Sequence, residues 1–430
     1  MHFSSELSYT PFSITKSMKV FFLGISGTLM GNLALMAKEL GHDVMGVDSK
    51  IYPPMSDQLK NANIDYLEGF TKENFREADV YIIGNVISRG NELLEFILES
   101  QKKIQSGPAW LYENILINRE VIAISGTHGK TTVTSMVVHG LKELGIEPGY
   151  LIAGVPEGKM SSYSLGSEDF FVIEADEYDT CYFDKNPKFF HYNPKYLLIN
   201  NLEFDHADIF DDIENIEDKF LELLQKMDSK SKAIINKDGI RDKFYQNLLS
   251  SNFNCSTKFL DIRNKDFTET NKILAESVLE AVSDKKLSDD LFQNFQGVRR
   301  RFEKVFVNKH YTIIDDFGHH PTAIEQVVLK AEKDFDDVVL IIEFGSNTMK
   351  SGLHDQKLKK IFSKRNTFLI NASIQQTNLF TNSVVLSKSN LSDVLDKRES
   401  DHRVILMCSN KKFMGIQDEL ISLISSQSGR

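Results

Sequence analysis

The stretch that most constrains the fold passes from a short apolar segment through a glycine-containing turn into a helical pattern. It spans residues 121–138 and reads VIAISGTHGKTTVTSMVV. The apolar residues 121–124 predict a buried parallel strand, and Val133, Met136 and Val137 recur at helical spacing. Glycines let backbone N–H groups approach an anion, and a helix N-terminus favours negative charge. The pattern therefore predicts an α/β chain folded around a bound nucleoside triphosphate.

Two residues of this turn carry side chains that suit a bound triphosphate and its metal ion. Lys130 can neutralise phosphate charge, and the hydroxyl of Thr131 can hold Mg²⁺. Thr127 and His128 alone separate the two glycines, so the general G-x-x-x-x-G-K-[ST] spacing is not met. A glycine-softened strand-to-helix turn without a ligand is the alternative. The residues predicted to hold the triphosphate are Gly126, Thr127, His128, Gly129, Lys130, Thr131 and Thr132.

The composition is typical of a chain with several globular domains. At 430 residues the chain is long enough for about three, and 41% hydrophobic with 26% charged residues is usual for soluble proteins. The net charge of −11 argues against nucleic acid or an anionic membrane as the main partner. Three widely spaced cysteines support neither a disulfide framework nor a zinc site. We therefore predict a cytoplasmic protein without nucleic-acid or membrane partners, whose oligomeric state stays open.

The amino-terminal residues are not part of the predicted fold. Residues 1–17 lack the charged start and continuous apolar core of a signal peptide, whereas MKVFFLG from Met18 predicts a first strand. We expect 1–17 to be a disordered tail or to precede the true start. A break at 106–108 and a triple arginine at 299–301 then suggest domains over 18–118, 119–298 and 299–430.

A second glycine-rich turn follows the first predicted strand. Gly24, Gly27 and Gly31 lead into a helix, and Asp48 ends the next predicted strand about 20 residues on. In dinucleotide-type folds such a turn meets a pyrophosphate, and the acid meets a sugar hydroxyl. The spacing differs from G-x-G-x-x-G, so helix-packing glycines and a capping Asp48 are the alternative.

Polar and charged residues follow three further predicted strands. Arg89 could clamp a phosphate or carboxylate, although a lone loop arginine is more often solvated. Glu174 could complete the coordination of Mg²⁺ that Thr131 begins. His206 could ligate a second cation or orient a phosphate, with a solvated acidic turn as the alternative. The three strands are predicted at 81–87, 170–173 and 196–200.

The last third of the chain predicts a second Rossmann-like sheet. A turn that begins DDFGHHPT opens a helix and would place Asp316 on a ribose. The triple arginine precedes this sheet at a predicted hinge, where an arginine could reach the nucleotide. Apart from 233–236, residues 219–270 show poor periodicity and carry little structural signal. The predicted strands are 312–314, 338–342, 367–370, 384–386 and 404–407.

In this order, these stretches resemble the Mur ligase family. The resemblance runs from about residue 18 to the C-terminus and includes LGISGTLMG, YPPMS, GTHGKTT, IEADEYD, NNLEFDHADIFDD, RRRFE, DDFGHHPTAI and SNTMK. It implies three α/β domains: a Rossmann-like UDP-sugar domain, a central P-loop ATPase-type parallel sheet, and a Rossmann-like domain that closes over the acceptor. EFDHADIFDD and SNTMK point to the branch that recycles murein peptide.

The resemblance also implies roles for individual residues, with ATP and Mg²⁺ as cofactors. Lys130, Glu174 and His206 form the implied catalytic set, and Thr131, Glu174 and His206 the metal ligands. Asn271, Arg301 and Asp316 would join the phosphate loop in binding ATP. UDP-sugar binding is implied for Gly24, Gly27, Thr28, Gly31, Asp48, Ser88 and Arg89.

The implied reaction is ATP-dependent amide formation. ATP phosphorylates the lactyl carboxylate of UDP-N-acetylmuramate, and the amine of L-Ala-γ-D-Glu-meso-diaminopimelate attacks the acyl phosphate. Phe344-Gly345 and Lys411-Lys412 replace a proline-arginine pair and a glycine pair of the family, so the acceptor is less firmly specified than the ligase class. L-alanine or another amino acid as acceptor, and a nucleotide-sugar-binding protein without turnover, are the alternatives.

Overall fold

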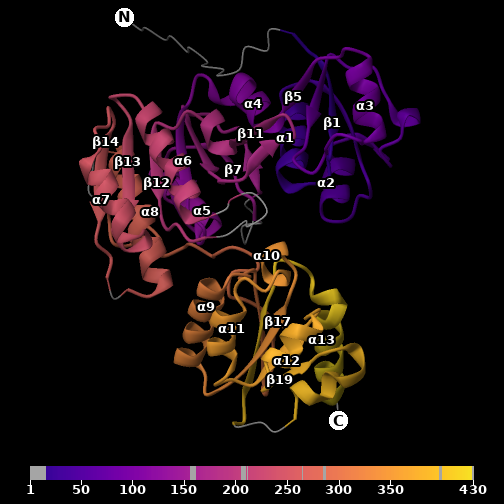
Figure 1. Ribbon diagram of the computed structural model, residues 1–430, viewed down its shortest axis with the longest axis vertical. Coiled ribbons are helices and arrows are strands. Elements are labelled where there is room, and N and C mark those ends of the chain that lie inside the picture. The colour runs from indigo at the N-terminus through magenta and orange to yellow at the C-terminus, as the bar shows by residue number, and fades with distance from the viewer. Residues whose placement is uncertain are drawn as a thin grey trace, which may run out of the picture. The chain divides into compact units, whose positions relative to one another are not determined.

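The chain forms two compact units, each built on parallel-rich sheets (Figure 1). The computed structural model describes residues 16–154, 161–204, 210, 212–263, 265–283, 287–396 and 400–428. The first unit comprises Met1–Phe204 and Asp212–Gln296, and the second comprises Asp205–Asp211 and Gly297–Arg430. The α/β class is confirmed. The tail predicted over 1–17 lies outside the described residues as far as residue 15.

The first sheet of the first unit has five parallel strands in the order β3-β2-β1-β4-β5. Its central strand β1 is buried on both faces, which explains the continuous apolar run after Lys19. Its strands are β1 Lys19–Leu23, β2 Asp43–Asp48, β3 Asp65–Glu68, β4 Val80–Ile83 and β5 Ile104–Ser106. Its helices are α1 Thr28–Glu39, α2 Met55–Asn61, α3 Glu92–Glu99 and α4 Gly107–Leu111, with the 3₁₀ helix η1 Lys72–Asn74 and the π-helix η2 Tyr112–Leu116.

Residues 106–108, which predict an interruption of regular structure, lead from β5 directly into helix α4. The Ser106 hydroxyl accepts a hydrogen bond from the backbone N–H of Ala109 at 3.3 Å. Pro108 lies in the first turn of α4, where its missing N–H costs no helical hydrogen bond. The sequence Ser-Gly-Pro here is a helix cap.

The second sheet of the first unit has seven strands in the order β14-β13-β12-β6-β9-β7-β8. Pairing is parallel except between β7 and β8. Helices α5 and α8 pack closely against each other at Gly140. A Cβ on this glycine would lie only 2.3 Å from Cδ1 of Leu279. The strands are β6 Glu120–Ser125, β7 Gly149–Leu151, β8 Tyr163–Ser164, β9 Phe170–Glu174, β12 Tyr196–Ile199, β13 Lys232–Asn236 and β14 Ser256–Leu260. The helices are α5 Lys130–Glu143, α6 Ile213–Lys226, α7 Asp242–Ser250 and α8 Phe267–Ser283, with η4 Lys237–Gly239. A hairpin of β10 Asp179–Cys181 and β11 Asp184–Pro187 leads into η3 Lys188–His191.

The stretch 219–270 contains regular structure that its weak periodicity did not predict. It holds α7 and β14, together with parts of α6 and α8, and β13 covers the excepted residues 233–236. Strand β14 is the edge of its sheet, and Ser256, Thr257 and Lys258 are exposed. An edge strand facing water does not require the apolar pattern of a buried one.

The second unit has a six-stranded sheet in the order β15-β16-β20-β17-β18-β19. Consecutive residues of its central strands face different cores: Ile313 belongs to one apolar cluster and Ile314 to the other. The five strands predicted here are present, and β15 forms an additional antiparallel edge. The strands are β15 Glu303–Val307, β16 Tyr311–Asp316, β17 Asp337–Glu343, β18 Thr367–Ile370, β19 Ser383–Val385 and β20 Arg403–Cys408. The helices are α9 Pro321–Asp334, α10 Asn347–Lys350, α11 Asp355–Phe362, α12 Ile374–Leu379 and α13 Ile416–Ser428, with η5 Lys388–Val394 and η6 Phe413–Gly415.

Among the described residues, no helix is both long and apolar enough to cross a membrane.

Candidate active site

The phosphate loop, residues 126–130, joins β6 to α5 and requires glycine at two points. Gly126 has φ +143° and Gly129 has φ +80°, values that side chains disfavour. A Cβ on Gly129 would lie 2.8 Å from Oδ1 of Asn271 and 2.9 Å from Nδ2 of Asn200. Residue 129 is therefore too close to polar neighbours for any residue but glycine.

Two asparagines at the end of β12 hold this loop. The backbone N–H groups of Thr127 and His128 donate to the backbone O and the Oδ1 of Asn201, at 2.9 and 2.8 Å. The side-chain amides of Asn200 and Asn201 donate to the carbonyl of His128, at 2.9 and 3.1 Å. Sequence analysis missed both residues. The available signal was two consecutive asparagines directly after a buried strand, at the sheet edge where ligands bind.

Thr131 and Glu174 meet at the carboxyl ends of the strands β6 and β9. The Thr131 hydroxyl donates to Oε2 of Glu174 at 3.0 Å, and the N–H of Ala153 donates to Oε1 at 2.7 Å. Burial, followed by the charge of Asp176, raises the pKa of Glu174 to about 7. This carboxyl therefore exchanges a proton near neutral pH, and an arriving cation would favour its ionised form.

Lys130 folds back over its own loop. Its Nζ donates to the carbonyl of Gly126 at 2.6 Å and lies 3.6 Å from carboxylate oxygens of both Asp176 and Glu177. Burial by itself would lower the pKa of Lys130, but the negative charges led by Glu177 and Asp176 raise it overall. The ammonium is therefore charged and held beside the loop that would receive phosphate groups.

The oxygen atoms around Thr131 suit Mg²⁺. This ion prefers hydroxyl, carboxylate and phosphate oxygens, and Thr131 and Glu174 provide the first two. Asp176 is a further carboxylate at this edge, bordering the same cavity as Glu174. The residues present thus fit the metal, and their role as its ligands stays a prediction. His206, the third predicted ligand, lies outside the described residues.

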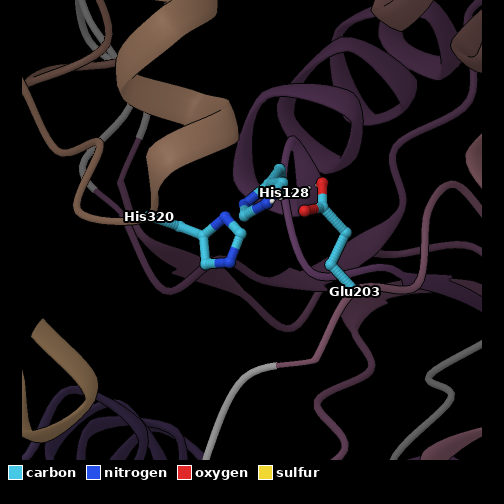
Figure 2. A group of neighbouring side chains, drawn as sticks. All are labelled: His128, Glu203 and His320. Atoms are coloured by element: carbon cyan, nitrogen blue, oxygen red, sulfur yellow. Dashed lines mark ion pairs between the residues drawn. The ribbon is translucent and has the colours of Figure 1, made fainter. Parts of the chain in front are cut away.

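His128 and Glu203 come together beside the phosphate loop, and Figure 2 shows their side chains next to each other. Nε2 of His128 lies 3.4 Å from Oε1 of Glu203. The backbone N–H of Glu203 also donates to the Thr127 hydroxyl at 2.9 Å. The segment after β12 is therefore tied to the loop by side chains as well as backbone. His320, also labelled in Figure 2, belongs to the second unit.

The other predicted ATP residues lie in two different units. Asn271 on α8 belongs to the first unit; it is 2% exposed, and its Oδ1 has no hydrogen-bond partner among the described residues. Asp316 belongs to the second unit and accepts hydrogen bonds from the backbone N–H groups of Phe302 and Gly318, at 2.8 and 2.7 Å. Arg301 lies over the ring of Phe317, 5.1 Å from its centroid. Their roles toward ATP stay predictions.

The glycine-rich turn after β1 is closed by Asp48. Oδ2 of Asp48 accepts from the backbone N–H and the hydroxyl of Ser26, at 2.9 and 2.5 Å, and Oδ1 accepts from the N–H of Ser49 at 2.7 Å. Gly24 has φ +87°, and a Cβ on Gly31 would lie 2.3 Å from the sulfur of Met55. The alternative of helix-packing glycines is thus present, whereas Asp48 closes the turn through Ser26 and does not cap α1. Gly27 and Thr28 lie exposed at the start of α1.

Arg89 forms an ion pair on the surface. Its Nε and one terminal nitrogen donate to the two carboxylate oxygens of Glu95, at 2.8 and 2.9 Å, and its side chain is 68% exposed. Ser88 beside it is exposed as well. A ligand phosphate would have to compete with Glu95 for the guanidinium, so a UDP-sugar contact of these two residues stays a prediction.

Two sequence profiles match the chain. One, described as Mur ligase family, catalytic domain, matches residues 19–117; the other, Mur ligase middle domain, matches residues 124–292. The UDP-N-acetylmuramate–L-alanyl-gamma-D-glutamyl-meso-2,6-diaminoheptandioate ligase of Escherichia coli is 36% identical over 78% of this chain and 81% of its own length. A murein peptide ligase structure from Psychrobacter arcticus is 30% identical, with a TM-score of 0.70 and coverage of 94% of this chain and 98% of that one.

A more distant structure shares the fold. The UDP-N-acetylmuramate-alanine ligase structure from Thermotoga maritima is 18% identical, with a TM-score of 0.76. The match covers 95% of this chain and 100% of that one. At that identity the likeness concerns architecture.

Proposed function

Because the chain belongs to the Mur ligase family, we propose that it joins UDP-N-acetylmuramate to the peptide L-alanyl-γ-D-glutamyl-meso-diaminopimelate. Enzymes of this family are ATP-dependent ligases that form C–N bonds. One observation carries the proposal: Lys130, Thr131 and Glu174 are assembled at one sheet edge in a chain 36% identical to a ligase of that name.

The reaction follows from the chemistry of the two substrates. A lactyl carboxylate oxygen attacks the γ-phosphorus of ATP, which forms an acyl phosphate and releases ADP. The neutral amine of the peptide then attacks the acyl carbon and gives up a proton to solvent. The amide forms as phosphate leaves with the electrons of the broken C–O bond. A protein contributes to both steps by aligning the reactants and stabilising charge that develops in the transition state.

This chain supplies that charge and alignment at the phosphate loop. Lys130 would exchange its contacts with Asp176 and Glu177 for phosphate oxygens, and the N-terminus of α5 adds positive partial charge. Thr131 and Glu174 would hold Mg²⁺, which when bound supplies positive charge at the transferring phosphoryl group.

The decisive experiment is an acceptor panel with product mass spectrometry. Purified protein receives ATP, Mg²⁺ and UDP-N-acetylmuramate with the tripeptide, L-alanine, other amino acids or no acceptor. Of these acceptors, we expect only the tripeptide to give phosphate release and a product with the mass of UDP-muramyl tripeptide. An L-alanine adduct in its place would assign the chain to the amino-acid-adding activity, and UDP-sugar binding without any product would indicate a protein without turnover.

A further inference from the structure

The first unit contains a cavity between the first turns of α1 and the carboxyl ends of β7 and β9. It connects two parts of the candidate site, because Thr28 borders it from the glycine-rich turn and Glu174 borders it from the phosphate-loop side. Its other polar lining residues are Asn32, Asp176, Lys188 and Tyr192, and the remaining walls are mainly apolar. A ligand in this cavity would therefore lie between the predicted UDP-sugar turn and the predicted ATP site.

Lys188 places a buried cation on this cavity. It follows the β10–β11 hairpin, is 9% exposed, and its Nζ lies 4.7 Å from the ring centroid of Tyr178. The hydrogen bond that it donates to Oδ2 of Asp176 is long, at 3.5 Å. The other oxygen of Asp176 lies 3.6 Å from Lys130, so the carboxylate is shared between two lysines. A lysine ammonium has three N–H donors, and this geometry leaves Lys188 able to bind an anion on its cavity side.

Asn32 provides an independent indication of a ligand. The residue is fully buried, and its Oδ1 accepts a hydrogen bond from the Ser162 hydroxyl at 3.0 Å. Its Nδ2 has no hydrogen-bond partner among the described residues. A buried N–H₂ group without an acceptor is costly. Because Asn32 also borders the cavity, we take the missing acceptor to come from a bound molecule that reaches this side chain.

We propose that Lys188 and Asn32 bind the carboxylate of the sugar acid and orient it toward the phosphate loop. The inference rests on the proposed function for the identity of the ligand. Both residues donate hydrogen bonds, as a carboxylate requires, and Lys188 adds the charge that offsets the neighbouring acids. The apolar walls suit the methyl group and ring carbons of a lactyl sugar. Lys188 is thus a substrate-binding residue that distinguishes a sugar acid from a neutral sugar.

The test compares two nucleotide sugars that differ in the lactyl ether group, which carries this carboxylate. Calorimetric titrations measure Kd for UDP-N-acetylmuramate and UDP-N-acetylglucosamine, with Mg²⁺ and a non-hydrolysable ATP analogue present throughout. We expect Lys188→Met to weaken UDP-N-acetylmuramate about 10- to 100-fold, as loss of a charge-assisted hydrogen bond does. Affinity for UDP-N-acetylglucosamine should stay within about twofold, which also shows that the variant folds.

Matched variants sharpen the result. Lys185→Met removes a lysine that lies in β11 of the preceding hairpin, is 70% exposed and pairs with Asp179 at 2.8 Å; we expect it to change neither affinity. Lys188→Arg keeps the charge and should recover part of the selectivity. Asn32→Leu preserves the side-chain shape and should lower the ratio of the two affinities in the same direction as Lys188→Met.

The outcome separates this inference from the proposed function. Product formation by the wild-type protein tests the ligase reaction, whereas the ratio of the two affinities tests the carboxylate site. If Lys188→Met and Asn32→Leu both leave that ratio unchanged, or weaken both nucleotide sugars equally, Lys188 merely neutralises Asp176 and the inference is wrong.

Discussion

Glu174 makes stability depend on pH in a direction opposite to most carboxylates. Burial raises its pKa to about 7 from an ordinary 4.5, so the folded state binds its proton more tightly than the unfolded state. Its contribution to stability is fully present below about pH 4.5 and is lost as the pH rises through about 7. We expect the free energy of unfolding of Glu174→Gln to exceed that of the wild type by about 1–3 kcal/mol at pH 8. The difference should vanish at about pH 4.5. Urea unfolding without Mg²⁺ measures this, and parallel pH profiles would contradict it.

Loss of Lys130 should impair turnover far more than it impairs UDP-sugar binding. Its Nζ is held over the phosphate loop and does not border the cavity that meets the glycine-rich turn. We expect Lys130→Ala to lower kcat by at least about 10³-fold, since a phosphate-binding cation is lost, with UDP-N-acetylmuramate Kd within a few fold. Lys142→Ala, near the other end of α5, is the control. A comparable loss of both quantities would mean that the two sites are misassigned.

At the scale of elements, the phosphate loop depends on the fit between the start of α5, the end of β12 and the side of α8. Gly129→Ala would combine a left-handed backbone with a Cβ 2.8 Å from Asn271. We expect it to cost about 1–3 kcal/mol and to weaken ATP binding at least about tenfold, because the loop must move.

Gly145→Ala is the matched control for this element. Its φ of +77° is similar, but a Cβ there meets nothing within 4 Å. Backbone strain should therefore lower its melting temperature without changing ATP affinity. If the two variants lose ATP affinity equally, close approach to Asn271 is not what fixes the loop.

At the scale of the whole molecule, the second unit has its own buried ion pair. Nε of Arg403 donates to Asp337 at 2.9 Å, and both side chains are almost fully buried. Removing one partner leaves a buried charge, so we expect Arg403→Met to destabilise this unit by about 3–5 kcal/mol. UDP-N-acetylmuramate affinity should be unchanged, because the residues proposed to bind it belong to the first unit.

The control for this prediction is Lys388→Met, which breaks the exposed pair between Lys388 and Glu419 in the same unit. An exposed ion pair contributes less than about 1 kcal/mol to stability, so the unfolding curve of Lys388→Met should nearly match that of the wild type. Differential scanning calorimetry with and without the nucleotide sugar distinguishes the two units. A loss of UDP-sugar affinity in Arg403→Met would show that the second unit contributes to that site.

Local chemistry explains why part of this protein could be read from its sequence. The strand-turn-helix around Lys130 and the position of Glu174 after a buried strand depend on periodicity over a few residues and on what glycine allows. The same applies to the strands of the second unit, whose continuous apolar runs reflect burial on both faces. The edge strand β14 was missed because water, which imposes no pattern, covers it.

The sequence by itself determined the phosphate loop, its lysine and the acid that meets Thr131, because each follows from residues that are neighbours along the chain or end adjacent strands. The tertiary structure decided the rest. The order β12-β6-β9 brings Asn200 and Asn201 to the loop, and the hairpin carries Lys188 back to Asp176. The fold buries Asn32 at the border of a cavity and leaves its Nδ2 without an acceptor among the described residues. Contacts between segments far apart in the chain depend on strand order and side-chain direction, which no local pattern encodes.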